Sequence, residues 1–199
     1  MSYTRDEIKS AVISKGYVWF NDDANKSYDV NIVGVRNSST GKVVTNLFDD
    51  VMTLSFKNDK GEWQYYEWTI TTEPGKKGVM EFHNEGGVAR VVPGQYRGSH
   101  AIGLHQGKYQ ALKQAKPIKV YRDSDKDMEF DENKITEGIY GINIHHAGAD
   151  STYVENWSEG CTVFKRIVDF DAFMKIINTA AKIHGNSFTY TLIESSDIK

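Results

Sequence analysis

The segment that decides the fold is Val51-Met-Thr-Leu-Ser-Phe-Lys-Asn-Asp-Lys-Gly-Glu-Trp-Gln-Tyr-Tyr-Glu-Trp-Thr-Ile70. It contains two runs rich in β-branched and aromatic residues, and the turn-forming residues 58–61 separate them. β-Branched and aromatic side chains favour strands, whereas Asn, Asp and Gly favour tight turns. The segment therefore predicts a hairpin of antiparallel strands at 51–56 and 63–70.

Runs of the same kind occur on both sides of this hairpin. They predict further strands at 28–36, 88–92, 118–121, 141–145, 161–164 and 188–193. Residues 94–107 are spaced by glycines and match neither the strand nor the helix period, so we expect a structured loop there.

Two helices are expected outside the strands. Thr4 and Glu7 have the spacing of a capping box, and Gly16 ends the apolar repeat that follows. In the second half, Asp169 or Asp171 can cap a helix that Gly185 ends. This helix places Phe173, Ile177 and Ala180 on one face. The fold class expected is α+β, β-rich, with peripheral helices.

Composition excludes several classes of protein. The chain has 199 residues, of which 39% are hydrophobic, and 24 Lys+Arg against 27 Asp+Glu leave a net charge of −3. Such a chain lacks the polycation that nucleic-acid binding requires. No stretch approaches the roughly 20 apolar residues that span a bilayer. The start of the chain lacks the pattern of a signal peptide, so we expect synthesis in the cytoplasm and no membrane insertion.

The sequence contains one cysteine, Cys161, so an intramolecular disulfide is impossible. It follows Gly160 at the start of a predicted strand, and His145 and His146 end the preceding strand. If these strands are neighbours, an imidazole can activate the thiol as a nucleophile. The glycine would allow a tight turn, with backbone N–H groups near Cys161 for an oxyanion.

The pattern Ile144-His145, a polar loop and Ser158-x-Gly160-Cys161 resembles the catalytic domain of the L,D-transpeptidases, the YkuD-like family. The resemblance implies a YkuD-like antiparallel β-sandwich or barrel core. It also implies that Cys161 attacks a carbonyl of a peptidoglycan stem peptide to give an acyl-enzyme, with His145 as the general base. An amine acceptor would then give a cross-link, and water would give carboxypeptidase or endopeptidase activity. Ser158 and Gly160 would shape the turn that presents the thiol.

The wider chain looks like a phage and prophage group that carries a divergent domain of this family. The segments that carry this likeness are 31–36, 71–75, 93–96, 107–112, 120–123, 141–146 and 157–161. No clear linker divides the chain, so we expect one compact unit, with an N-terminal β-rich subdomain and short leading helix in 1–92, and the resemblance implies that 93–199 is the catalytic region. A phage-type context favours lysin-like hydrolysis over cross-linking, and peptidoglycan would be the partner. Delivery to the cell wall or periplasm would then need a holin, a tail or a secretion system.

Two departures from the family pattern leave alternatives open. The family's glycine after the first histidine is His146 here, so either His145 or His146 could be the base. The family's Arg or Asn two positions after the cysteine is Val163 here. A contact to a substrate carboxylate would then come from Arg166, Arg122 or Arg97.

Four further residues are candidates for substrate binding. Trp157 lies four positions before Cys161, and His105 lies in the glycine-spaced loop together with His100. Tyr109 and Arg122 belong to segments that carry the family likeness.

Asp123, Asp125 and Asp127 imitate the opening of a calcium loop. Met128 and Lys134 stand where such a loop has its glycine and its glutamate, so an acidic surface loop is expected, with calcium as the alternative. No cofactor is expected.

Two other functions are compatible with the sequence. One is a non-catalytic cell-wall-binding or virion structural protein with a relic site. The other is a zinc hydrolase that uses Cys161 and His145 with one of His100, His105 and His146.

Overall fold

The hairpin expected at residues 51–70 forms strands β2 (Asp50–Lys57) and β3 (Trp63–Thr71). The two strands are antiparallel and in register from Asp50 opposite Ile70 to Lys57 opposite Trp63. In the turn, the Asn58 side chain accepts hydrogen bonds from the backbone N–H groups of Lys60 and Glu62. The turn chemistry seen in the sequence thus fixes the register of the longest pairing in the molecule.

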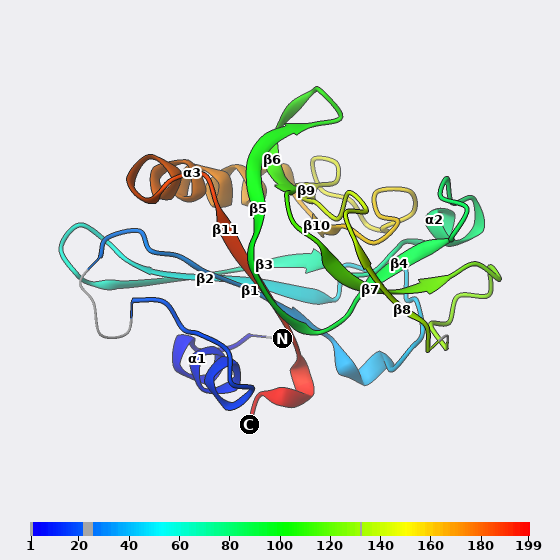
Figure 1. Cartoon of the computed structure of the whole chain (residues 1–199), viewed down its shortest axis with the longest axis horizontal. Coiled ribbons are helices and arrows are strands. Elements are labelled where there is room, and N and C mark those ends of the chain that lie inside the picture. The colour runs from blue at the N-terminus through cyan, green and yellow to red at the C-terminus, as the bar shows by residue number, and fades with distance from the viewer. Residues whose placement is uncertain (1, 22–25, 132) are drawn as a thin grey trace.

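In the computed structural model, which describes residues 2–21, 26–131 and 133–199, this hairpin is part of a closed eight-stranded barrel. The barrel order is β1-β11-β5-β6-β9-β10-β3-β2 (Figure 1). The other six strands are β1 (Asn31–Arg36), β5 (Gly94–His105), β6 (Tyr109–Gln114), β9 (Ile144–His146), β10 (Thr162–Phe164) and β11 (Phe188–Glu194). The expected β-rich α+β class is confirmed, and residues 1–92 and 93–199 both contribute strands to the one barrel.

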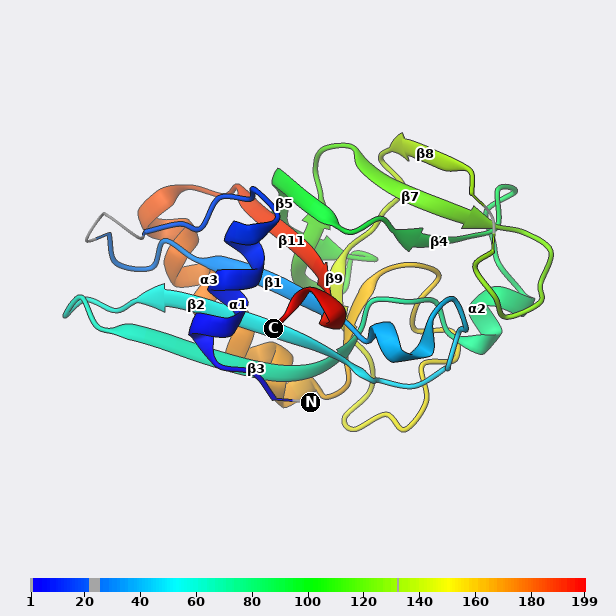
Figure 2. The same cartoon turned by 90° about the horizontal axis from the view of Figure 1, so that it is seen from below.

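A second, three-stranded sheet lies beside one end of the barrel (Figure 2). It contains β4 (Val88–Val91), β7 (Ile118–Asp123) and β8 (Ile135–Gly138), with β7 in the middle. A buried ionic network joins it to the barrel: the Glu73 carboxylate contacts Arg36 of β1 at 3.3 Å and Arg90 of β4 at 2.7 Å. The two sheets are therefore linked by charge as well as by packing.

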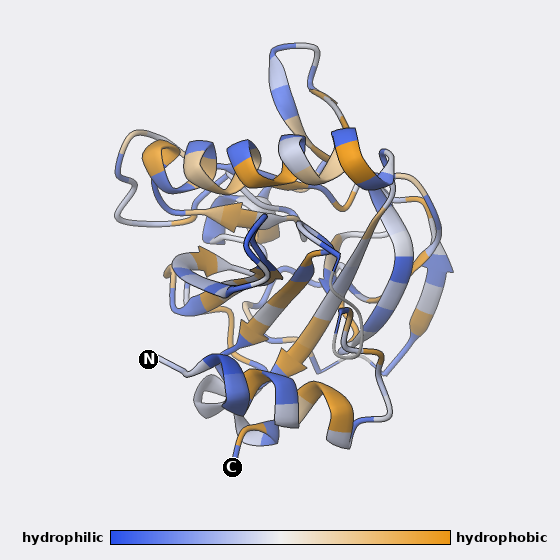
Figure 3. Cartoon of the chain, turned by 90° about the vertical axis from the view of Figure 1, so that its left-hand side faces the viewer, coloured by the Kyte–Doolittle hydropathy of each residue, from blue (hydrophilic) through white to orange (hydrophobic). Residues whose placement is uncertain are grey.

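The two longer helices cover opposite sides of the barrel strands (Figure 3). α1 (Arg5–Ser14) begins with the expected capping box, in which Thr4 and Glu7 bond reciprocally, and buries Ile8, Ala11 and Val12. α3 (Ile167–His184) buries Phe170, Phe173, Met174, Ile177 and Ala180, and Gly185 is its C-cap at φ 90°. A third, short helix, α2 (Lys76–Met80), was not expected from the sequence. No helix in the described part of the chain is long and apolar enough to cross a membrane.

The predicted start of α3 was wrong. Neither Asp169 nor Asp171 is the N-cap, because the helix begins at Ile167 with Arg166 in the capping position. Asp169 lies instead in the first turn, where it forms a 2.7 Å ion pair with Arg166. A carboxylate in the first turn is favoured by the helix dipole, and the earlier start lets the helix present Phe170 to the core.

The predicted loop at 94–107 was also wrong, because residues 94–105 form β5, the longest strand. β5 pairs with β11 on one side and with β6 on the other, so tertiary pairing supplies its backbone with partners. The glycines have local roles within it: Gly98 adopts φ 60°, and Gly103 leaves room for the Lys113 side chain, which a Cβ there would meet at 3.0 Å.

The strand expected at 141–145 is shorter and later, because only Ile144–His146 are in a strand. The expectation of antiparallel pairing holds for most of the barrel but is wrong at two seams. β1 pairs with β11, and β9 pairs with β10, in parallel. The second of these parallel seams contains His145 and begins directly after Cys161.

Candidate active site

The parallel pairing of β9 and β10 places Cys161 and His145 on the same face of the barrel wall. Val163 is the register partner of His145, and Thr162 is the partner of Ile144. Side chains that are paired in register point to the same side, and residues two apart in a strand do so too. Cys161, two positions before Val163, therefore shares a face with Asn143 and His145, whereas Ile144 and Phe164 lie in the buried core cluster.

The turn before β10 is held by the hydroxyl of Ser158, which is buried. This hydroxyl donates to the Cys161 carbonyl at 2.9 Å and accepts from the Gly160 backbone N–H at 3.0 Å. Gly160 adopts φ 137°, and a Cβ there would lie 2.6 Å from the Ala89 carbonyl oxygen. Only glycine fits this position, so Ser158 and Gly160 both shape the turn that carries the cysteine.

His145 is oriented by a backbone carbonyl. Its Nδ1 lies 3.0 Å from the carbonyl oxygen of His146 and 3.4 Å from the Tyr109 hydroxyl. A carbonyl only accepts, so Nδ1 carries the proton and Nε2 holds the lone pair. No partner of Nε2 occurs among the described residues. Burial and the neighbouring His105 lower the pKa of His145 to about 3, so the ring is neutral at pH 7.

The Cys161 sulfur contacts two backbone groups in the segment just before β9. It accepts from the Asn143 N–H and donates to the Gly141 carbonyl, both at 3.4 Å. Burial raises the pKa of the thiol to about 11, and the Asn143 N–H opposes that rise. The resting thiol is therefore protonated at pH 7. No acceptor of the Cys161 backbone N–H occurs among the described residues.

A cleft of about 940 Å³ opens over this face. Six residues proposed from the sequence line it: Cys161, His145, His146, His105, Tyr109 and Trp157. The other residues that line it were not predicted: Gln106, Lys108, Lys113, Gln114, Ile139, Tyr140, Gly141, Ile142, Asn143, Asn156 and Glu159. Strand alternation could have identified Asn143, which lies two positions before His145.

Three aromatic rings form one wall of the cleft. The rings of His105 and His145 stack with centroids 4.1 Å apart, and Tyr109 lies 5.4 Å from His105. His146 points away from His145, because alternate residues of a strand face opposite sides. Its ring stacks on Tyr109 at 4.2 Å and lies 5.2 Å from Phe170 of α3. Both imidazoles line the cleft, and by strand alternation His145 is the one on the same side of the sheet as Cys161.

His105 and Asn143 extend this arrangement across the face. The Asn143 side-chain amide lies 3.4 Å from His105 Nδ1, so Nδ1 accepts and the ring's proton is on Nε2. Burial lowers the pKa of His105, and His146, Lys113 and Lys108 add to the effect. His105 is thus a second neutral imidazole beside His145.

The arginines considered for a substrate carboxylate do not line the cleft. Arg122 lies over the Tyr140 ring at 4.4 Å and donates to the Gly87 carbonyl. It therefore contacts a residue that lines the cleft without lining the cleft itself. Arg166 pairs with Asp169, and Arg97 lies over Phe20. The cations that do line the cleft are Lys108 and Lys113, and neither has an acidic partner among the described residues.

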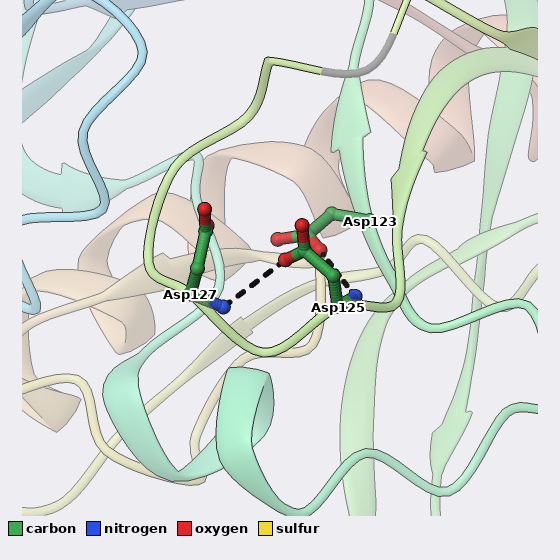
Figure 4. Close-up of side chains that lie close together, drawn as sticks. All are labelled: Asp123, Asp125 and Asp127. Atoms are coloured by element: carbon green, nitrogen blue, oxygen red, sulfur yellow. Dashed lines mark hydrogen bonds between the residues drawn. The ribbon is translucent and has the colours of Figure 1, made fainter.

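The aspartates expected to resemble a calcium loop do lie together (Figure 4). Oxygens of Asp123, Asp125 and Asp127 lie within 4.8 Å of one another, and the carboxylates of Asp123 and Asp125 accept from the backbone N–H groups two residues later. Within residues 2–21, 26–131 and 133–199 this is the only group of three His, Cys, Asp or Glu side chains with such convergence. The zinc set of Cys161 with two histidines is therefore not assembled.

Comparison with known proteins gave no match: no family model, no curated protein and no solved structure is similar to the chain.

Proposed function

We propose that this protein is a cysteine-dependent acyl-transfer enzyme that acts on the stem peptides of bacterial peptidoglycan. The observation that carries the proposal is the placement of Cys161 and His145 on one face of the β9–β10 seam, at the floor of the cleft. The carbonyl of His146 orients His145 as the third member of a nucleophilic triad would.

The first half of the reaction forms a thioester. As the Cys161 sulfur bonds to the substrate carbonyl carbon, its proton passes to Nε2 of His145. The carbonyl oxygen becomes an oxyanion that the Cys161 backbone N–H can stabilise. The C–N bond then breaks, and the leaving amine takes the proton from Nε2.

The second half releases the acyl group. Water gives a proton to Nε2 and adds to the thioester carbonyl, the C–S bond breaks, and the sulfur recovers the proton. An amine in place of water would give a cross-link. We favour water, because the wider likeness is to phage-type proteins that would degrade the wall. The products are then those of an L,D-carboxypeptidase or endopeptidase.

The pKa values define the resting state of this pair. The thiol, at about 11, and His145, at about 3, are both neutral at pH 7. The imidazole is therefore a base that takes the proton during attack, rather than half of a preformed thiolate–imidazolium pair. This predicts slow reaction of the free protein with small alkylating agents at neutral pH.

The cleft also supports a substrate that carries carboxylates. Lys108 and Lys113 line it without acidic partners, and Glu159, the one acidic residue that lines it, is paired with His83. Stem peptides bear free carboxylates. Val163, which stands where the family has Arg or Asn, is fully buried, so we assign the carboxylate contact to the two lysines of the cleft, Lys108 and Lys113.

The YkuD-like assignment is part of the proposal. It is supported by the Ser158-x-Gly160-Cys161 turn, by the histidine on the neighbouring strand, and by a β-rich barrel that presents both. We infer that the protein acts at the cell wall as a lysin-like enzyme, delivered there by a holin, a tail or a secretion system.

The test is turnover of defined muropeptides, with products resolved by mass, for the native chain and for Cys161→Ala. We expect hydrolysis by the native protein and none by the variant. Thermal unfolding should show that the variant keeps its fold. An active alanine variant would overturn the proposal, and a cross-linked product would replace hydrolysis with transpeptidation.

One observation favours a second candidate, a wall-binding or virion structural protein with a relic site. The Cys161 sulfur bonds only to backbone groups among the described residues, and its pKa is high. Such a protein would sediment with purified cell walls and leave muropeptides unchanged.

A further inference from the structure

The segment 138–143, which runs from the end of β8 to the start of β9, supplies both polar contacts of the Cys161 sulfur. Gly141 provides the carbonyl that accepts from the thiol, and Asn143 provides the N–H that donates to it. Residues 139–143 belong to no strand or helix, and at their far end the Asn143 carbonyl ties them to the barrel strands by accepting from the Thr162 N–H of β10 at 3.0 Å. The position of the thiol's partners therefore depends on whatever fixes this segment.

One side chain fixes most of it. The amide oxygen of Gln114, at the end of β6, accepts from the backbone N–H of Tyr140 at 2.9 Å and of Ile142 at 3.0 Å. The amide nitrogen of Gln114 donates to the carbonyls of Gly138 at 2.7 Å and Lys116 at 2.9 Å. The two N–H groups that donate to the Gln114 amide oxygen belong to the residues directly before and after Gly141.

Two further bonds complete the clamp. The backbone N–H of Gln114 donates to the Asn143 side chain at 3.0 Å, and His100 donates from Nε2 to the Ile142 carbonyl at 3.0 Å. Gln114 is 9% exposed, so its amide is satisfied by these backbone groups and not by water. A buried side chain with four such bonds is costly to replace, because each lost partner leaves an unsatisfied group.

We propose that Gln114 is a positioning residue for the Cys161 thiol, acting through the segment 138–143. Its amide bonds to backbone groups and not to the thiol. It holds the Gly141 carbonyl and the Asn143 N–H where they contact the sulfur, and it keeps that segment closed over the cysteine. The proposal rests on the proposed function only for its effect on turnover, because thiol reactivity can be measured directly.

The direction of the effect follows from the contributions to the thiol pKa. Burial is the largest and raises that pKa, whereas the Asn143 N–H lowers it. Releasing the segment exposes the thiol to water and also removes the Asn143 hydrogen bond. Because burial is the larger of these two effects, the thiol pKa falls from about 11 toward its ordinary value of 9.0. The titratable groups that line the cleft with Cys161 are Glu159 in the preceding turn, Tyr109 and Lys113 on β6, His105 on β5, Lys108 between those two strands, Tyr140 in the segment itself, and His145 and His146 on β9. All of them remain in the substituted protein.

The experiment uses the full chain with Gln114→Met, which keeps the side chain's length and removes all four of its hydrogen bonds. Alkylation by iodoacetamide is followed by intact mass across pH 6–11, and Cys161 is the only thiol in the sequence. We expect the apparent thiol pKa to fall by about one unit, which makes alkylation at pH 8 roughly tenfold faster. Muropeptide turnover should fall by roughly 10- to 100-fold, because the thiol is more reactive but misplaced.

The matched control is Asn31→Leu. Asn31 is another buried amide that holds backbone, since it accepts from and donates to Phe20, and it does not line the cleft. Its alkylation profile should equal that of the native chain. A Gln114→Met profile that equals the native one would overturn the proposal.

If Gln114→Met does not fold, Gln114→Asn decides. It keeps an uncharged amide but is one methylene shorter, so it cannot reach all four backbone partners, and we expect a shift of the thiol pKa in the same direction but smaller. An unchanged profile in Gln114→Asn would then overturn the proposal. If the native protein turns over no muropeptide at all, the proposed function fails, but the alkylation profiles still decide the role of Gln114.

Discussion

Gly160 has the most restricted backbone among the residues around the thiol. It combines φ 137° with a Cβ position only 2.6 Å from the Ala89 carbonyl oxygen. We expect Gly160→Ala to destabilise the protein by more than about 2 kcal/mol, because backbone strain and a clash with backbone add. Urea unfolding monitored by fluorescence measures the loss.

Gly16→Ala is the control for the strain alone. Gly16 has φ 76°, but nothing lies within 4 Å of its Cβ position. The expected cost there is about 1 kcal/mol. Equal losses in the two variants would show that the contact of Gly160 with Ala89 does not constrain the turn.

The assignment of the base to His145 gives a second prediction at the same scale. His145→Gln should lower kcat by at least about 100-fold, because the proton acceptor is lost. His146→Phe keeps the ring stacked on Tyr109 and keeps the backbone carbonyl that orients His145, so its kcat should stay within a few-fold of the native value. A larger loss in His146→Phe than in His145→Gln would reverse the assignment.

At the scale of elements, the sequence predicted those strands whose apolar and β-branched residues are continuous. Residues 51–70 gave the hairpin and its turn, and Thr4 gave the start of α1. β5 was missed because its glycines hide the pattern, and its neighbours β6 and β11 come from elsewhere in the chain.

The candidate site was partly predictable for the same reason. Cys161, His145 and the Ser158–Gly160 turn lie close together in sequence, and local chemistry marks them. The parallel register of β9 and β10, which puts His145 rather than His146 on the same side of the sheet as Cys161, is a tertiary property. Lys113 and Gln114 belong to β6, which precedes β9 and β10 by a long stretch of chain. The local spacing around His145 and Cys161 therefore gave no sign of their role.

The junction of the two sheets gives a prediction for the element scale. Glu73 is 8% exposed and pairs with both Arg36 and Arg90. Glu73→Leu leaves two buried guanidinium groups without this carboxylate, so we expect a loss of roughly 3 kcal/mol in unfolding free energy. Urea unfolding measures it.

The exposed pair of Lys165 and Asp150, at 3.1 Å, is the control. Asp150→Asn should cost less than about 1 kcal/mol, because solvent screens such a pair. If Glu73→Leu costs no more than Asp150→Asn, the buried network does not hold the two sheets together.

For the whole molecule, two buried neutral histidines should make stability depend on pH. The pKa of His100 falls to about 4 and that of His145 to about 3, in both cases mainly through burial. Each binds a proton more readily in the unfolded chain, with its ordinary pKa of 6.5. Their contribution is therefore fully present above pH 6.5 and is lost as the pH falls toward 4, by about 1.4 kcal/mol per pH unit for each histidine.

Urea unfolding of the native chain and His100→Gln at pH 7, 6 and 5 tests this dependence. The variant lacks His100, so on unfolding it takes up one proton fewer than the native chain. The native chain therefore loses stability faster as the pH falls, and the difference in stability between the two proteins should shrink. Curves that stay parallel from pH 7 to pH 5 would show that His100 is not held neutral by burial.

The central claim, that Cys161 carries an acyl group during turnover, is tested most directly by intact-mass measurement of the protein quenched during reaction with a defined tetrapeptide muropeptide. The account predicts an acyl adduct on the native chain that maps to Cys161, disappears with the alkylated protein, and is absent from Cys161→Ala. Turnover of the muropeptide without any adduct, and at the same rate in Cys161→Ala, would contradict it.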